Sequence, residues 1–226
     1  MGLSEIRDIG PLSARYCSEG ARLPELIRVL ENIRLGDSVS ETRGKVKEGR
    51  VLTHPSYETR VSVWGHLNRR YFVIDRWVLE SLVKQSEFGE TSIEFKALAY
   101  LYYVLRDRFT YNVVTDLVWG FWENRKGSIE SHDVIDLMDR YSEDNPEILN
   151  WKESTRKKLS RNLMAALRDF GLLSGNNRKF IQQPSISDET VFHLLCVQME
   201  EGLMGNQIIE SRDWRMFLWD NNMVSH

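Results

Sequence analysis

One stretch of the sequence, "SIEFKALAYLYYVLRDRF", is apolar on nearly every side when it is drawn as a helix. Its middle, "ALAYLYYVL", carries no charge and ends at Arg106. A helix of this kind has no face for water and is buried at the centre of a helical bundle. It is also too short to cross a membrane, since a span needs about 20 apolar residues. We therefore predict a mainly α-helical bundle, with Ser92 to Arg108 as its buried central helix.

Helical patterns also precede this segment. Pro24 suits the first turn of a helix that runs through "PELIRVLENI", a short polar helix is expected over Ser40 to Glu48, and a longer helix starts at Ser56 or Tyr57. We place a loose boundary at "SEFGETS". It divides the chain into an N-terminal helical subdomain, residues 1–88, and a C-terminal helical subdomain, residues 89–226. The 226 residues are enough for one large domain or two small ones.

Positive charge is concentrated in one helix and one turn, although the formal net charge of the chain is -3. Between Lys152 and Lys179, eight cations accompany two acids. On a helix over residues 152–170, Leu159, Leu163 and Leu167 share one face and most cations lie opposite. The following "GLLSGNN" predicts a short β-hairpin within residues 171–182, and helix and hairpin together outline a winged helix. The candidate phosphate-binding residues are Lys152, Arg156, Lys157, Lys158, Arg161, Arg168, Arg178 and Lys179.

A second basic region lies between Arg43 and Arg76, where eight cations accompany three acids. Its short helix, "GRVLTHPS" turn and longer helix resemble a loose helix-turn-helix unit, although the turn is long for one. We expect Ser62, His66 and Arg69 to point outward from the longer helix. The candidate nucleic-acid-binding residues of this region are Lys45, Lys47, Ser62, His66, Arg69 and Arg70.

Both basic regions also have a plainer interpretation. A charged helix face is commonly only solvated, and Glu153 and Lys157 have the spacing of an ordinary i,i+4 ion pair. The segment from Glu130 to Glu147 carries seven acids and one cation, so it can pack against the basic helix and neutralise it. The N-terminal region can be a three-helix packing unit with polar residues outside. The sequence leaves these alternatives open.

Signatures of catalysis are missing from the sequence. It contains no GxGxxG and no GxxxxGK[ST] motif, and its five histidines are scattered. His193 and Cys196 form at most half of a metal site, so we expect a buried cysteine beside a hydrogen-bonded histidine. We therefore predict no enzyme, no metal, no cofactor and no small-molecule substrate. Cys17 and Cys196 lie far apart, which fits a reducing cytoplasm but leaves one bridge open, and the first ten residues do not resemble a signal peptide.

A series of segments gives the chain a family resemblance. The order "LPELIRVLENI", "YETRVSVWGHLNRRY", "EFKALAYLYYVLRD", "WKESTRKKLSRNLMAALRDFGLL", "FIQQPSIS" and "SRDWRMFLWD" resembles the BrxA family, small components of BREX bacteriophage-exclusion systems. The resemblance implies an all-helical fold like that of the antitermination factor NusB, and double-stranded DNA binding without known catalysis. It carries over no catalytic residues. Some relatives bear the label of inner-membrane proteins, and the lack of a spanning segment in this sequence argues against a membrane here.

These observations favour a non-catalytic, double-stranded DNA-binding accessory protein of a BREX system. We expect weak sequence specificity, because most candidate contacts are Lys or Arg, which bind phosphates and carry no sequence information there. Other BREX components are expected as further partners. Two alternatives remain: a protein-interaction scaffold whose basic helix docks an acidic partner, and an RNA-binding protein that uses the NusB-like fold.

Overall fold

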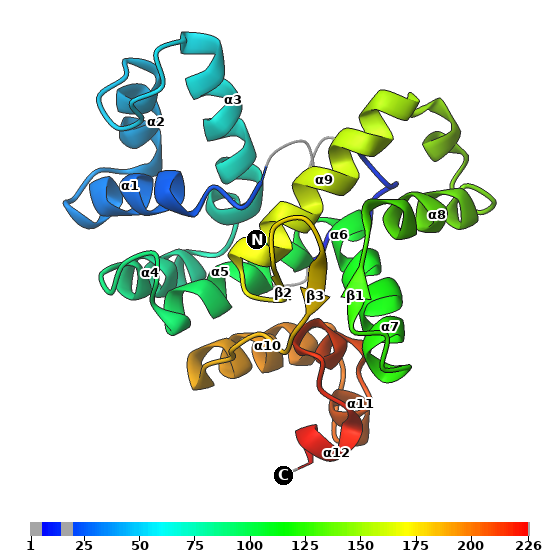
Figure 1. Cartoon of the computed structure of the whole chain (residues 1–226). Coiled ribbons are helices and arrows are strands. Elements are labelled where there is room, and N and C mark those ends of the chain that lie inside the picture. Colours follow the sequence, from blue (N-terminus) through cyan, green and yellow to red (C-terminus); the bar gives the residue numbers. More distant parts are fainter. Residues whose placement is uncertain (1–5, 15–19, 226) are drawn as a thin grey trace.

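The segment that is apolar on every side forms α5 (Ile93–Leu105) in the computed structural model, which describes residues 6–14 and 20–225. Every residue from Ala97 to Leu105 is buried. Ser92 caps the helix, because its hydroxyl oxygen accepts a hydrogen bond of 3.2 Å from the amide of Phe95. Figure 1 shows α5 in the middle of the molecule, with other helices around it. The predicted buried central helix is confirmed.

The helices before α5 form one group, drawn on the left of Figure 1. Its members are α1 (Leu23–Arg34), α2 (Val39–Lys47), α3 (Tyr57–Leu67), the π-helical turn η3 (Asn68–Phe72) and α4 (Arg76–Ser86). Ser38 and Glu41 form a reciprocal capping box at the start of α2, and Ser56 caps α3. The helices predicted from Pro24, over 40–48 and from Ser56 or Tyr57 are confirmed. Helix α4 packs on both α1 and α5, so this group is joined directly to the central helix.

Irregular helical turns follow the central helix. The chain runs through α6 (Arg108–Asn112), the π-helical η4 (Val113–Val118) and α7 (Trp119–Glu123) without a break. Asp107 starts this run, since its Oδ1 accepts a hydrogen bond of 3.2 Å from the amide of Phe109. A short strand β1 (Ser128–Ile129), helix α8 (Ser131–Tyr141) and the 3₁₀ turn η5 (Pro146–Asn150) lead to the basic helix.

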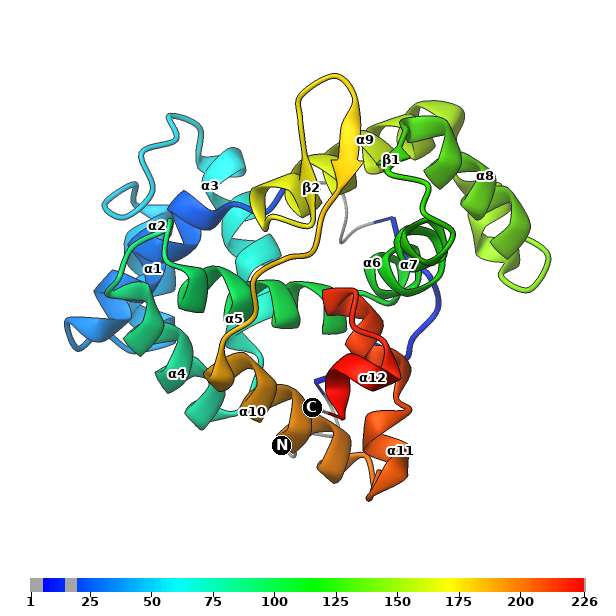
Figure 2. The same cartoon turned by 60° about the horizontal axis from the view of Figure 1, so that its bottom comes forward.

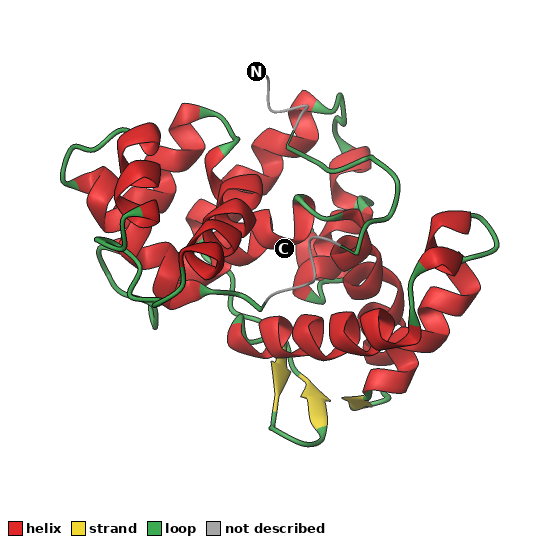
Figure 3. Ribbon diagram, turned by 90° about the horizontal axis from the view of Figure 1, so that it is seen from above, coloured by secondary structure: helices red, strands yellow, loops and turns green. Residues whose placement is uncertain are grey.

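The basic helix is α9 (Glu153–Asp169), and a β-hairpin of β2 (Leu173–Ser174) and β3 (Lys179–Ile181) follows it. The predicted hairpin is confirmed. A third strand was not expected: β1 pairs with the free edge of β3, which gives an antiparallel sheet in the order β1-β3-β2. Figure 3 shows the strands beside the long helix α9, and the sheet therefore extends the surface of that helix.

The C-terminal part consists of α10 (Asp188–Glu200), α11 (Asn206–Ile209), η6 (Arg212–Phe217) and α12 (Asn221–Val224). Helix α10 packs on the central helix α5 (Figure 2). The N-terminal Arg7 ties this part to the beginning of the chain. Its guanidinium group donates hydrogen bonds of 2.7 and 3.0 Å to Glu201 and of 3.0 and 2.8 Å to Asp213. Because the planar guanidinium group donates two hydrogen bonds to each carboxylate, it holds both in a defined orientation and neutralises part of their charge.

The buried apolar side chains form one cluster, to which nearly all of the longer helices contribute. The division at 86–92 and the likeness to NusB stay predictions. Within the described residues, none of the helices has the length and apolar content needed to cross a membrane.

Candidate nucleic-acid interface

Helix α9 is held on the protein by its apolar face. Leu159, Leu163 and Leu167 are buried, as the helical spacing predicts, and Phe170 at the end of the helix joins them in the core. Because 3.6 residues make one turn, residues half a turn away from these leucines must face solvent.

One side of α9 is fixed by the acidic helix α8. The hydroxyl of Ser160 donates a hydrogen bond of 2.9 Å to the carbonyl of Ser131. Arg156 donates to the carbonyl of Ile135 at 3.3 Å and forms an ion pair with Asp139. The acidic segment does pack against the basic helix. Arg156 is half-buried and its charge is neutralised by Asp139 of that segment.

The other side of α9 presents cations to solvent. Lys157 and Arg161 lie on the exposed face, and Lys152 and Lys158 extend it at the N-terminal end. Lys157 forms an exposed i,i+4 ion pair with Glu153, at 2.6 Å. Among the described residues, Lys152, Lys158 and Arg161 have no acidic partner within 4.0 Å. We call Lys152, Lys157, Lys158 and Arg161 the α9 stripe.

The hairpin adds one exposed cation to the same region. Figure 2 shows the hairpin projecting from the protein next to α9. Arg178 is exposed near its tip and donates a hydrogen bond of 3.3 Å to the hydroxyl of Ser128 in β1. Arg168 is half-buried: it pairs with Asp169 at 3.0 Å and donates to Oδ1 of Asn176 at 3.2 Å. Arg168 therefore braces the hairpin against α9.

Lys179 does not lie at an exposed hairpin tip, so that expectation is wrong. Lys179 is only 8% exposed, and its Nζ donates hydrogen bonds to the carbonyls of Gly175 at 2.7 Å and Asn176 at 2.8 Å. The alternation of a strand places Lys179 on the inner face with Ile181, and Phe180 points outward. Lys179 holds the turn together.

His66 and Arg70 in the second basic region are buried, although His66 was expected to point outward and Arg70 was a candidate nucleic-acid contact. Arg70 pairs with Asp107 and donates to the carbonyl of Tyr103. Burial, followed by the positive charges of Arg70 and Arg69, lowers the pKa of His66 to about 3. The end of α3 is covered on both sides, so neither residue can meet a nucleic acid.

The other candidate residues of this region offer little exposed positive charge. Lys45 pairs with Asp37 at 2.6 Å, Lys47 and Arg69 are half-buried, and Ser62 is exposed. Arg60, which sequence analysis did not single out, donates hydrogen bonds from its guanidinium group to the carbonyls of Lys47, His54 and Pro55. The exposed first turn of α3 carries Glu58, so this helix does not present a cationic recognition face.

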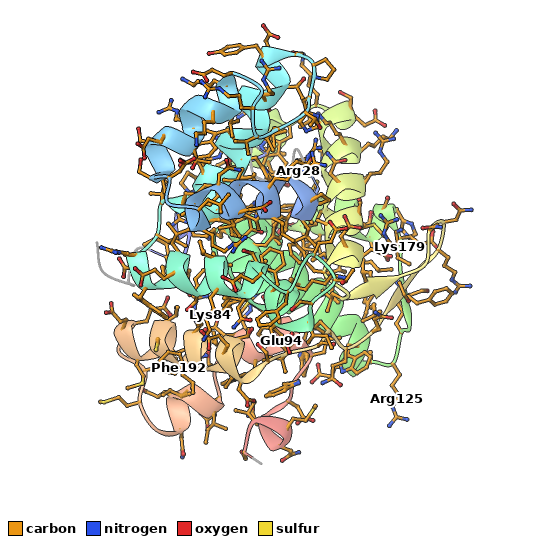
Figure 4. The ribbon with its side chains drawn as sticks, turned by 90° about the vertical axis from the view of Figure 1, so that its left-hand side faces the viewer. Arg28, Lys84, Glu94, Arg125, Lys179 and Phe192 are labelled. Atoms are coloured by element: carbon orange, nitrogen blue, oxygen red, sulfur yellow. The ribbon has the colours of Figure 1, made fainter. Side chains whose placement is uncertain are left out.

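Within residues 6–14 and 20–225, no cluster of three His, Cys, Asp or Glu side chains could hold a metal ion. His193 is buried and its Nδ1 lies 2.6 Å from the hydroxyl of Tyr102, as expected of a hydrogen-bonded core histidine. Cys196 is half-buried, so the expectation of a buried cysteine is wrong. Sequence analysis missed Arg125, an exposed cation just before β1. Figure 4 shows Arg125 on the same side of the molecule as Lys179 of the hairpin. The run "WENRK" is the signal that could have found it.

Fold and surface together define a mainly α-helical protein with a solvent-facing cationic helix and an adjoining hairpin. The family model for BrxA matches residues 11–196, and the chain belongs to the BrxA family. Membership of this accessory family implies a role associated with BREX.

A crystal structure of an uncharacterized protein from Magnetospirillum magneticum is similar to this chain. The alignment covers 90% of this chain and 98% of the other, with 14% sequence identity and a TM-score of 0.69. At this identity the likeness concerns the fold alone. No curated protein matches the chain.

Proposed function

We propose that this chain binds double-stranded DNA as a non-catalytic accessory component of a BREX system, with little sequence preference. The α9 stripe and Arg178 form the contact surface. The proposal places the protein in the cytoplasm, with other BREX components as further partners.

The observation that carries the proposal is the exposure of the α9 stripe in a chain of net charge -3. Lys152, Lys158 and Arg161 have no acidic partner among the residues that the structure describes, although acids outnumber cations in the chain. A local cluster of free cations attracts a polyanion, and neutralised phosphates release condensed counterions, which favours binding.

Weak specificity follows from the kind of side chain on this surface. Lysine and arginine bind phosphate oxygens at any sequence, and the paired readout of adenine uses Asn or Gln amides. The Asn176 amide oxygen already accepts a hydrogen bond from Arg168. Competition by unrelated duplex DNA should therefore be nearly complete.

A gel-shift comparison of two charge-matched double variants tests the proposal. Lys157→Ala with Arg161→Ala removes two cations from the stripe, and Arg76→Ala with Lys84→Ala removes two exposed cations from α4. We expect only the first pair to weaken the binding of a labelled duplex. Equal losses would indicate a general charge effect, and no shift of duplex or RNA by the wild type at physiological salt would favour the scaffold alternative.

A further inference from the structure

A pocket of about 580 Å³ opens between α7 and the C-terminal turn η6–α12. It is lined by Trp119 and Trp122 of α7, by Arg125 in the turn before β1, and by Leu218 and Met223 from the C-terminal part. Its volume lies within the range of about 300–1,000 Å³ that is usual for small-ligand sites. Its lining mixes flat aromatic rings with charged groups.

The aromatic rings are accessible in this pocket. Trp122 is 38% exposed and Trp119 is half-buried, and none of the residues of α7 is buried. The guanidinium carbon of Arg215 lies 5.6 Å from the centroid of the Trp119 ring, a cation–π distance. Two accessible indoles beside cations form a platform on which a base can stack.

Charged groups of both signs stand at the rim. Arg125 is exposed and has no acidic partner among the residues of 6–14 and 20–225, so its guanidinium group can take a phosphate. Glu123 is also exposed at the pocket and can accept hydrogen bonds from the amino groups of a base. Lys126 is occupied, because its Nζ lies 2.9 Å from Asp133 and 3.6 Å from the Phe121 ring centroid.

Backbone strain coincides with this pocket. Three described residues other than glycine have a positive φ, and two of them, Arg125 and Leu218, both at 56°, line the pocket. Arg125 ends α7 in the manner of a C-terminal cap: its amide donates to the carbonyl of Trp122, and the next amide donates to the carbonyl of Phe121. Glycine occupies such a position without strain, and strained backbone positions of other residues cluster at binding sites.

We propose that this pocket binds one unpaired nucleotide of a DNA single strand. The base stacks on Trp122 and Trp119, and a backbone phosphate binds Arg125. The pocket lies near the DNA surface proposed above, because β1 joins the hairpin sheet and Ser128 accepts a hydrogen bond from Arg178. The site nevertheless uses none of the α9 stripe, so it does not depend on duplex binding.

Fluorescence anisotropy with a labelled single-stranded DNA 12-mer tests the site. Trp122→Ala should weaken single-strand binding about tenfold, the typical effect of removing one stacking platform, and Trp122→Phe should recover most of it. Arg125→Gly should also weaken it and, by relieving the backbone, should leave the melting temperature unchanged or raised. Phe192→Ala is the control, since Phe192 is 56% exposed on α10, away from this pocket (Figure 4).

The outcomes separate this site from the duplex surface. Lys157→Ala with Arg161→Ala should lower duplex affinity and keep the Trp122-dependent part of single-strand binding. If wild type does not bind the 12-mer, or if Trp122→Ala and Arg125→Gly bind it as wild type does, the proposal fails. It also fails if deoxyadenosine monophosphate binds in a Trp122-dependent way and the 12-mer does not. If the wild type binds the 12-mer but does not bind duplex DNA, only the function proposed above is overturned.

Discussion

Arg70 and Asp107 form an ion pair at the centre of the protein, with 3.3 Å between Nη2 and Oδ2 and side chains that are 0% and 1% exposed. The pair joins η3 to the start of α6. Arg70 also donates to the carbonyl of Tyr103, and the hydroxyl of Thr110 donates to Asp107. Arg70, which was predicted to belong to a basic surface, thus lies in the interior, where Asp107 neutralises its charge.

Removal of the carboxylate should therefore be costly. We expect Asp107→Ala to lower the free energy of unfolding by about 3–5 kcal/mol, because it leaves the Arg70 charge buried without its partner. Urea denaturation measures the loss. Asp75→Ala is a matched control, since Asp75 stands at the N-cap of α4 but its side chain accepts no capping hydrogen bond. A loss for Asp107→Ala as small as that of the control would contradict the structural role of the pair.

The sequence could predict the helices and the buried face of α9, because both follow from local spacing. It could not predict which cations of the second region were free. His66 and Arg70 lie on a part of the chain that is covered by residues far away, such as Tyr103 and Asp107, and helical phase carries no information about distant neighbours. The two-residue strand β1 likewise has too few residues to give a pattern.

Lys179 is a different case, because its burial followed from period-two alternation. Ile181 is an inward residue of β3, so Lys179 shares its face, and the exposed position belongs to Phe180, which is 47% exposed. The partners of Lys179 could not be foreseen, because two backbone carbonyls of the turn accept its hydrogen bonds. The charge of Lys179 predicted an exposed side chain, but its position in the strand was the stronger signal and predicted a buried one.

Acid should destabilise the protein through His66. Its pKa is about 3 in the folded state and about 6.5 in an unfolded chain, so below pH 6.5 the unfolded state binds more protons. The stabilising contribution of neutral His66 is complete above pH 6.5 and is lost as the pH falls toward 3. Between pH 7.5 and 5.0 we expect a loss of about 2 kcal/mol from this residue. His66→Gln should shrink the difference in unfolding free energy between these two pH values by that amount.

A surface histidine provides the control for this pH experiment. His132→Gln is the control, because the side chain of His132 is 66% exposed and is not buried as His66 is. The burial argument would be wrong if both variants changed the pH dependence equally.

Gly175 should tolerate a side chain less well than Gly171. Both have a positive φ, of 83° and 89°, so alanine is strained at either position, by about 1–2 kcal/mol. At Gly175 a β-carbon would also overlap the carbonyl oxygen of Arg178, whereas at Gly171 it would meet open space. We expect Gly175→Ala to lower the free energy of unfolding at least twice as much as Gly171→Ala in urea titrations. Equal losses would show that the turn can shift to accept the extra atom.

The salt dependence of duplex binding should report the α9 stripe. If about four phosphates are neutralised, log K falls with log[salt] at a slope of about -3.6, from about -0.9 per contact. Lys157→Ala with Arg161→Ala should flatten this slope by about two units, one contact for each residue. The melting temperature should not change, because both side chains are exposed. An unchanged slope at unchanged stability would mean that the stripe is only a solvated face.

Arg178 and Lys179 are neighbours with the same charge, and the structure exposes the first and buries the second. Arg178 is exposed, so Arg178→Ala should weaken duplex binding and flatten the salt slope by about one unit, with little change in stability. Lys179→Met keeps the aliphatic stem but removes two hydrogen bonds to the turn, so it should lower the melting temperature. At a temperature where the variant is fully folded, its salt slope should stay within about half a unit of the wild type, since Lys179 contacts no phosphate. Salt titrations and thermal melts of both variants provide the comparison, and a flattened slope for Lys179→Met without loss of stability would reverse the assignment.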